Sequence, residues 1–153
     1  MSLLHTFPLV SSYSQNGRLV IECHHGNEEC YGNKLHACSL ALVPNRTKAL
    51  LFNSCMMCPK GDSPGSDDVA ANTCGKIYDI DALTIKDCAK GCRGAKLLEH
   101  YSEESNRVHY EDVPYILING KQNNEDNFMY HVCATFANPP PPCRRMFDFR
   151  KRK

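Results

Sequence analysis

Cysteine content constrains the fold of this chain more than any other feature of its sequence. Ten of the 153 residues are cysteines, and a cytosolic protein rarely keeps that many unless they bind metal or do redox work. The even number fits a disulfide framework. We therefore expect a disulfide-rich protein, and the candidate half-cystines are Cys23, Cys30, Cys38, Cys55, Cys58, Cys74, Cys88, Cys92, Cys133 and Cys143.

Charge and hydropathy argue against several classes of function. The chain has 18 Lys and Arg against 17 Asp and Glu, so no global field points to a nucleic acid or a membrane surface. The last ten residues carry six basic side chains, and we predict a flexible basic tail over residues 144–153. No apolar run reaches the 18 or so residues of a membrane span.

The N-terminal sequence and the cysteine content indicate different cellular compartments. Residues 1–15 lack the basic n-region, unbroken apolar run and small-residue cleavage site of a signal peptide. The sequon Asn45-Arg46-Thr47 nevertheless predicts N-glycosylation at Asn45, which agrees with secretion. The simplest interpretation is that residue 1 is not the start of the complete gene product.

Hydrophobic periodicity and turn residues predict strands at both ends of a helical middle. The predicted strands cover residues 3–14, 17–23 and 112–122, and the predicted helices cover 28–42, 47–58, 67–75, 81–92 and 124–138. Asp81 and Asn124 are expected N-caps, Gly91 or Gly94 an expected helix end. Asn119-Gly120 predicts a hairpin turn. This order indicates an α+β or α/β fold with a helical insertion.

Two alternatives to a purely structural framework involve Cys55 and Cys58. Structural zinc needs four Cys or His ligands, usually in two tight pairs, and Cys88 with Cys92 could supply the second pair. That alternative predicts a zinc-stabilised cytosolic domain. Cys55-x-x-Cys58 also has the spacing of a catalytic dithiol, but Pro59 follows at once and presents no helix N-terminus. Ten cysteines and a sequon favour disulfides, so we expect no metal and no cofactor.

Residues 23–38 carry the most specific pattern in the chain. The fixed positions are Cys23, His25, Gly26, Glu29, Cys30, Asn33 and Cys38. Their spacing resembles the signature of the gamma-interferon-inducible lysosomal thiol reductase family, with His24 where the family has Gln. The segments "CAKGCRGAKLL" (88–98) and "VPYILINGK" (113–121), with Cys133 and Cys143, extend the resemblance over about residues 3–143.

The resemblance implies a single thioredoxin-like α/β domain with a helical insertion over residues 1–143. It also implies reduction of protein disulfides at acid pH in lysosomes: one thiolate attacks the substrate disulfide and a second thiol resolves the mixed disulfide. Pro114 would be the cis-proline that lies beside the dithiol in such folds. The resemblance further implies that Cys55 pairs with Cys74, and that the extra cysteines Cys58 and Cys92 pair with each other.

One departure from the family pattern bears on activity. The family's catalytic Cys-x-x-Cys lies upstream of the signature, and no cysteine precedes Cys23. We therefore expect a fold without its first core strand and helix, inactive as a reductase. Its partners would be disulfide-containing proteins if an upstream dithiol exists. Otherwise we expect a secreted, disulfide-stapled binding protein with an unknown protein or cell-surface partner, and a homodimer through the open sheet edge would pair its strands.

Overall fold

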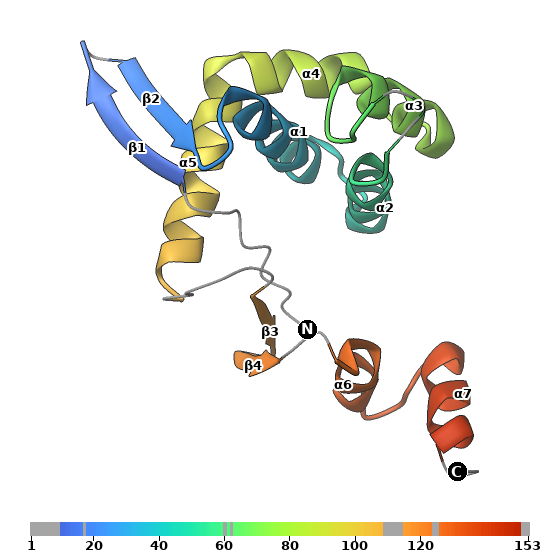
Figure 1. The fold of residues 1–153 in the computed structure, drawn as a ribbon. Helices are drawn as coiled ribbons and strands as arrows, with labels where there is room; N and C mark the ends of the chain where they lie inside the picture. The colour runs from blue at the N-terminus through green and yellow to red at the C-terminus, as the bar shows by residue number, and fades with distance from the viewer. Residues whose placement is uncertain are drawn as a thin grey trace. The chain divides into compact units, whose positions relative to one another are not determined.

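The computed structural model of the chain describes residues 10–16, 18–59, 61, 63–108, 115–123 and 126–150. The chain divides into two units at about residue 107 (Figure 1). The described part of residues 7–107 forms the larger unit, and the described part of residues 108–153 belongs to the smaller one. The two units contain mixed α and β structure that is mostly helical, with small two-stranded sheets.

The larger unit begins with an antiparallel hairpin and continues with helices (Figure 1). Strand β1 (Val10–Gln15) pairs with β2 (Arg18–Cys23), and Val10 lies opposite Cys23. The helices that follow are α1 (Asn27–Leu42), α2 (Arg46–Met56), α3 (Asp68–Tyr78), α4 (Ala82–Lys90) and α5 (Cys92–Asn106). A lone hairpin is marginally stable in water, so the contacts that β2 makes with α1 and α5 hold it in place.

Three helices of the larger unit begin at a side chain that accepts backbone N–H groups. Asn45 caps α2 by accepting from Lys48 N at 3.0 Å. Asp67 caps α3 by accepting from Ala70 N at 2.8 Å, and Asp81 caps α4 as the sequence predicts. Asn and Asp are strong N-caps because their side chains satisfy donors that the first helical turn leaves without partners. The helix starts are therefore encoded locally.

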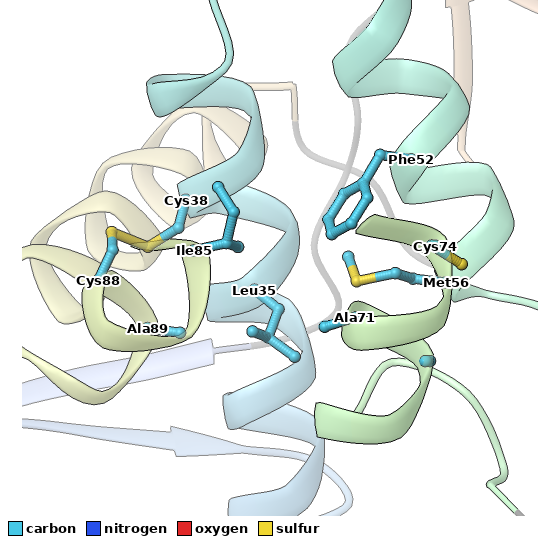
Figure 2. Close-up of a cluster of buried hydrophobic side chains, with 10 residues drawn as sticks. Leu35, Cys38, Phe52, Met56, Ala71, Cys74, Ile85, Cys88 and Ala89 are labelled. Carbon is cyan, nitrogen blue, oxygen red and sulfur yellow. A yellow bond between two sulfur atoms is a disulfide. The ribbon is translucent and has the colours of Figure 1, made fainter. Parts of the chain in front are cut away.

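The core of the larger unit lies around α1, which contacts α2, α4 and α5. Figure 2 shows apolar side chains from α1, α2, α3 and α4 converging in this core, with the Cys38–Cys88 disulfide among the buried residues. Its largest fully buried members are Phe52, Leu35 and Met56. Side chains that are packed this closely hold the helices in fixed positions. Burial of apolar side chains therefore stabilises the larger unit together with the disulfides.

A buried polar cluster links α1 to its neighbours. The Ser39 hydroxyl hydrogen-bonds the carbonyl of His36 and the amide oxygen of Asn53, and Asn53 Nδ2 donates to the same carbonyl at 3.3 Å. His36 Nε2 lies 2.9 Å from the hydroxyl oxygen of Ser66, just before α3. Buried polar groups destabilise a fold unless they are paired, and here the pairs fix α1 against α2 and the entry to α3.

The smaller unit consists of a hairpin and two helices joined by a disulfide. Strand β3 (Ile116–Ile118) pairs with β4 (Lys121–Asn123), and Asn119 and Gly120 have φ angles of 51° and 77°. Two positive φ angles are those of the predicted Asn-Gly turn. Helices α6 (Phe128–Ala134) and α7 (Pro141–Arg150) follow. Cys133 of α6 is bonded to Cys143 of α7, with Cα atoms 5.2 Å apart.

Three sequence-based expectations about helices need correction. Gly91 ends α4, as one of the two predicted helix ends has it, but the further helix α5 that starts at Cys92 was not predicted. Gly94 instead lies buried inside α5, where a Cβ would come within 2.6 Å of the Cys88 carbonyl oxygen. Helix α6 begins at Phe128 with Asn127 as N-cap, while Asn124 lies outside the described residues. The predicted basic tail is helical as far as residue 150.

Helix α7 has a physical cause that the tail prediction overlooked. Four prolines occupy residues 139–142, between the predicted helix 124–138 and the predicted tail. Pro141 is the first residue of α7, a position where proline is favoured because its ring fixes a helical φ and its missing N–H is not needed. Arg144 N then donates to the Pro140 carbonyl at 3.1 Å. The prolines therefore start α7, whereas α6 has already ended at Ala134.

Candidate functional site

The signature at residues 23–38 forms the turn from β2 into α1. Gly26 is the N-cap of α1 with φ 90° and ψ −162°. Its N–H donates to the Cys23 carbonyl at 3.1 Å, and its own carbonyl accepts from Cys30 N at 3.1 Å. This backbone conformation is almost restricted to glycine. The signature glycine is thus required by the sharp change of direction between strand and helix.

Glu29 and His25 close the same turn from the side. The Glu29 carboxylate accepts the backbone N–H of His25 at 2.6 Å, and His25 Nδ1 lies 3.4 Å from the same oxygen. A Glu at the third helical position reaches back over the helix start in a capping box as well, but here the N–H that it accepts belongs to His25, the residue before the N-cap Gly26. The negative charge of Glu29 also interacts favourably with the positive end of the helix dipole. These two signature residues therefore stabilise the start of α1.

The three signature cysteines are all used in disulfides. Cys23 at the end of β2 is bonded to Cys30 in α1, with Cα atoms 5.4 Å apart. Cys38, which is fully buried, is bonded to Cys88 of α4 across 6.1 Å (Figure 2). Both Cα separations lie within the range of ordinary disulfides. In this structure the signature ties a strand, a helix and the helical core together, and its sulfurs are not thiols.

Asn33 is the signature residue that these contacts do not explain. Its Nδ2 atom is buried and has no hydrogen-bond partner among the described residues. A buried donor without a partner costs roughly 1–3 kcal/mol. No contact in the described part of the chain gives a physical reason for an asparagine at this position.

The remaining cysteines divide into bridged residues and exposed thiols. Cys55 of α2 is bonded to Cys74 of α3, with Cα atoms 5.9 Å apart, which is the pairing that the resemblance implies. Cys58 and Cys92 are exposed and belong to no disulfide. The predicted Cys58–Cys92 bridge is therefore wrong in this structure. The reason is that α2 packs on α1 and α3, whereas α5, which starts at Cys92, packs on α1 and α4.

The same pairings bear on the two alternatives for Cys55 and Cys58. Cys55 cannot act with Cys58 as a dithiol while it is bonded to Cys74. The zinc alternative needs thiolates at Cys55 and Cys88, and both are used in disulfides. In the described ranges no group of three or more His, Cys, Asp or Glu side chains is placed to hold a metal ion. The proposed cis-proline, Pro114, lies outside the described residues.

A charged cluster that sequence analysis missed joins α1, α3 and α4. The Tyr31 hydroxyl donates to Asp68 at 2.5 Å, and Lys90 Nζ lies 3.1 Å from the same carboxylate. Lys90 Nζ is also 5.8 Å from the centroid of the Tyr31 ring. These residues lie on three different helices, and Tyr31 and Lys90 are 59 positions apart in the sequence. No local pattern could have brought them together.

The cluster changes the ionisation of its members. Partial burial and the hydrogen bond to Asp68 raise the pKa of the Tyr31 phenol well above its ordinary value. The hydrogen bond from Tyr31, aided by Lys90, lowers the pKa of the Asp68 carboxyl below its ordinary 3.8. Asp68 therefore stays charged and accepting as the solution becomes moderately acidic.

The arrangement defines a disulfide-rich protein of mixed α and β structure, stapled at a strand-to-helix turn. Residues 4–78 match the family model described as gamma interferon inducible lysosomal thiol reductase (GILT). A GILT-like protein of Anopheles gambiae is 28% identical over 160 residues, which cover 92% of this chain and 66% of that protein. GILT-like protein ZK669.3 of Caenorhabditis elegans is 31% identical over 132 residues, covering 80% of this chain and 56% of that protein.

Together, the family model and these relatives show that the chain is similar to the GILT family. The gamma-interferon-inducible lysosomal thiol reductase of Carassius auratus is a further relative, 28% identical over 136 residues, covering 51% of its length. The chain thus spans between about half and two thirds of the length of these proteins. The family is lysosomal, and four disulfides agree with folding in the secretory pathway. No described helix is both long and apolar enough to serve as a membrane span.

Proposed function

We propose that these 153 residues form a GILT-type, thioredoxin-related scaffold that does not by itself reduce disulfides by a dithiol mechanism. The observation that carries the proposal is that Cys55 is in a disulfide bond and is not a thiol. Cys55-x-x-Cys58 is the one Cys-x-x-Cys pair in the printed sequence, and Cys55 is bonded to Cys74. The signature cysteines are likewise bonded, so they serve the fold.

Reduction of a protein disulfide needs two cooperating thiols. The first thiolate attacks the substrate and forms a mixed disulfide, and the second attacks that bond and releases the reduced product. Cys58 and Cys92 are the exposed thiols of the described chain. Cys58 follows α2, which packs on α1 and α3, whereas Cys92 begins α5, which packs on α1 and α4. One thiol alone would remain trapped in the mixed disulfide.

The substrate class follows from the family. Two relatives carry names that describe lysosomal thiol reductases. Where this chain is joined to a segment with a Cys-x-x-Cys pair, we expect disulfide-containing proteins as its substrates, in a lysosomal or secreted setting.

A second candidate function is that of a secreted, disulfide-stapled binding protein. Four disulfides without a reduced Cys-x-x-Cys pair favour it, since a scaffold of this kind needs no turnover. N-glycosylation at Asn45 would fit either candidate. Asn45 is exposed at the start of α2, and its Oδ1 is the atom that caps the helix. A glycan is attached through Nδ2, so glycosylation leaves the cap in place; loss of a glycan from the Asn45→Gln protein expressed in eukaryotic cells would verify it.

The test of the proposal is an insulin-reduction assay with the purified 153-residue chain. We expect precipitation of the insulin B chain no faster than with dithiothreitol alone, at acid and at neutral pH, with a thioredoxin as positive control. Circular dichroism on the same sample would establish that the protein is folded. Catalysed reduction that disappears in Cys55→Ser would contradict the proposal and restore the Cys55–Cys58 dithiol.

A further inference from the structure

Three cysteines gather where α2 ends. Cys55 is half-buried and bonded to Cys74, which is fully buried in α3. Cys58 lies three residues further on, exposed, in the turn after the helix. Cys58 N donates to the Cys55 carbonyl at 3.2 Å. A hydrogen bond across three residues closes a turn whose end Cα atoms lie within about 7 Å.

That separation decides what Cys55 can bond. Disulfides join Cα atoms that are about 4.4–6.8 Å apart, and the existing bond to Cys74 spans 5.9 Å. The backbone turn brings Cys58 close to the same range. Cys55 therefore has two cysteines within reach of a disulfide, one buried and bonded and one exposed and reduced.

We propose that Cys58 is the nucleophile of an internal thiol–disulfide exchange at the Cys55–Cys74 bond. The Cys58 thiol loses its proton to solvent, and its thiolate attacks Cys55 Sγ. The Cys55–Cys58 bond forms as the Cys55–Cys74 bond breaks, and Cys74 leaves as a thiolate that takes up a proton. One disulfide and one thiol exist before and after the step, so no external oxidant or reductant is needed.

Access selects the sulfur that is attacked. Cys74 is fully buried, whereas Cys55 is half-buried and its carbonyl accepts the Cys58 N–H, so Cys55 is the nearer and more accessible partner. The Cys58 thiol donates a weak hydrogen bond to the Ser54 carbonyl at 3.7 Å. Ionisation of Cys58 removes that donor and so weakens this contact with the helix end.

The two disulfide states differ in what they hold together. The Cys55–Cys74 bond spans 19 positions and ties α2 to α3, whereas a Cys55–Cys58 bond closes a small local loop. Longer loops give larger stabilisation in the chain-entropy model, so Cys55–Cys74 is the resting state. Exchange would leave α2 and α3 joined by packing alone and would convert Cys74 into a buried thiol.

Cys92 provides a matched control. It is exposed and follows the bonded Cys88 by four residues. Cys88, however, is only 9% exposed, and α5 packs so tightly there that a Cβ on Gly94 would lie 2.6 Å from the Cys88 carbonyl oxygen. We therefore expect no exchange between Cys92 and the Cys38–Cys88 bond.

Peptide mapping can distinguish the two states directly. Trypsin cleaves after Lys48, Lys60 and Lys76, so Cys55 and Cys58 share peptide 49–60 and Cys74 lies in peptide 61–76. The native protein is held without reductant at mildly alkaline pH, quenched with acid, unfolded with N-ethylmaleimide, digested and analysed by mass spectrometry. The resting state gives cross-linked 49–60 and 61–76 with N-ethylmaleimide on Cys58.

The exchanged state gives peptide 49–60 with an internal disulfide and peptide 61–76 with N-ethylmaleimide on Cys74. We expect this pair to grow with incubation time in the natural chain and in Cys92→Ser, and to be absent from Cys58→Ser. In Cys74→Ser, peptide 49–60 should carry the internal disulfide from the outset. Only the resting-state peptides in the natural chain, together with two labelled cysteines in Cys74→Ser, would overturn the proposal.

Discussion

The turn from β2 into α1 and the end of α2 both carry closely spaced cysteines, yet they use them differently. At the first, Cys23 and Cys30 bond to each other and the surrounding residues Gly26 and Glu29 fix the backbone. At the second, Cys55 bonds to a distant residue and Cys58 stays a thiol. Sequence spacing alone therefore does not assign a role to a cysteine pair. The packing of the helices that carry the cysteines decides it.

The largest effect is expected at the bond that joins the signature to the core. Cys38–Cys88 spans 50 positions, and the chain-entropy model gives such a bond about 4 kcal/mol. Replacing both residues by Ala should lower the free energy of unfolding by that amount, as measured by urea denaturation. Replacing Cys23 and Cys30 by Ala should cost only about 2.5 kcal/mol, because their loop is shorter. Equal losses in the two variants would show that loop length is not the cause.

A smaller effect is expected from the glycine of the turn. Gly26→Ala forces a Cβ onto a residue with φ 90° and ψ −162°, at a cost of roughly 1–3 kcal/mol. Nothing lies within 4 Å of the added Cβ, so backbone strain is the sole direct cause. Gly61→Ala is the control, since it has an equally open position at φ 61°, in the left-handed region that other residues can enter at less cost. Thermal unfolding would compare them, and a greater loss at Gly61 would contradict the strain argument.

The smallest effect is expected at the Tyr31–Asp68–Lys90 cluster, and it should depend on pH. The pKa of folded Asp68 is lowered, so its contribution to stability is present above the unfolded pKa and is lost as pH falls through the folded one. Tyr31→Phe removes the principal cause of that shift. It should cost about 1 kcal/mol near neutral pH, and less when Asp68 is protonated.

Urea titrations between about pH 6 and pH 3 would measure this dependence. Lys86→Ala is a useful control, because Lys86 also lowers the pKa of Asp68 but only through its charge, the weakest of the causes. Its effect should be smaller than that of Tyr31→Phe. A loss in Tyr31→Phe that stays constant across the range would show that the hydroxyl is not coupled to the ionisation of Asp68.

Much of the described fold was predictable because its signals are local. The helices corresponding to α1–α4 and the Asn119-Gly120 turn are encoded by periodicity, N-caps and residues that tolerate positive φ. Helix α5 was missed because Gly94 is a packing residue and not a helix end. Helix α7 was missed because proline can start a helix as well as end one.

The site was only partly predictable, for a different reason. The signature residues could be selected from their spacing, but a disulfide partner depends on which helices pack together. Cys38 finds Cys88 because α1 packs on α4. The same fact separates Cys58 from Cys92, and it brings Tyr31, Asp68 and Lys90 together from three helices. Long-range contacts of this kind leave no mark on the local sequence.

The most direct test of this account is a count of thiols in the unreduced protein. The chain would be unfolded in the presence of N-ethylmaleimide without a reductant, and its intact mass measured. Four disulfides and thiols at Cys58 and Cys92 predict two adducts per molecule. Ten adducts would indicate a reduced or metal-binding protein, and none would indicate the Cys58–Cys92 bridge. Either result would contradict the scaffold described here.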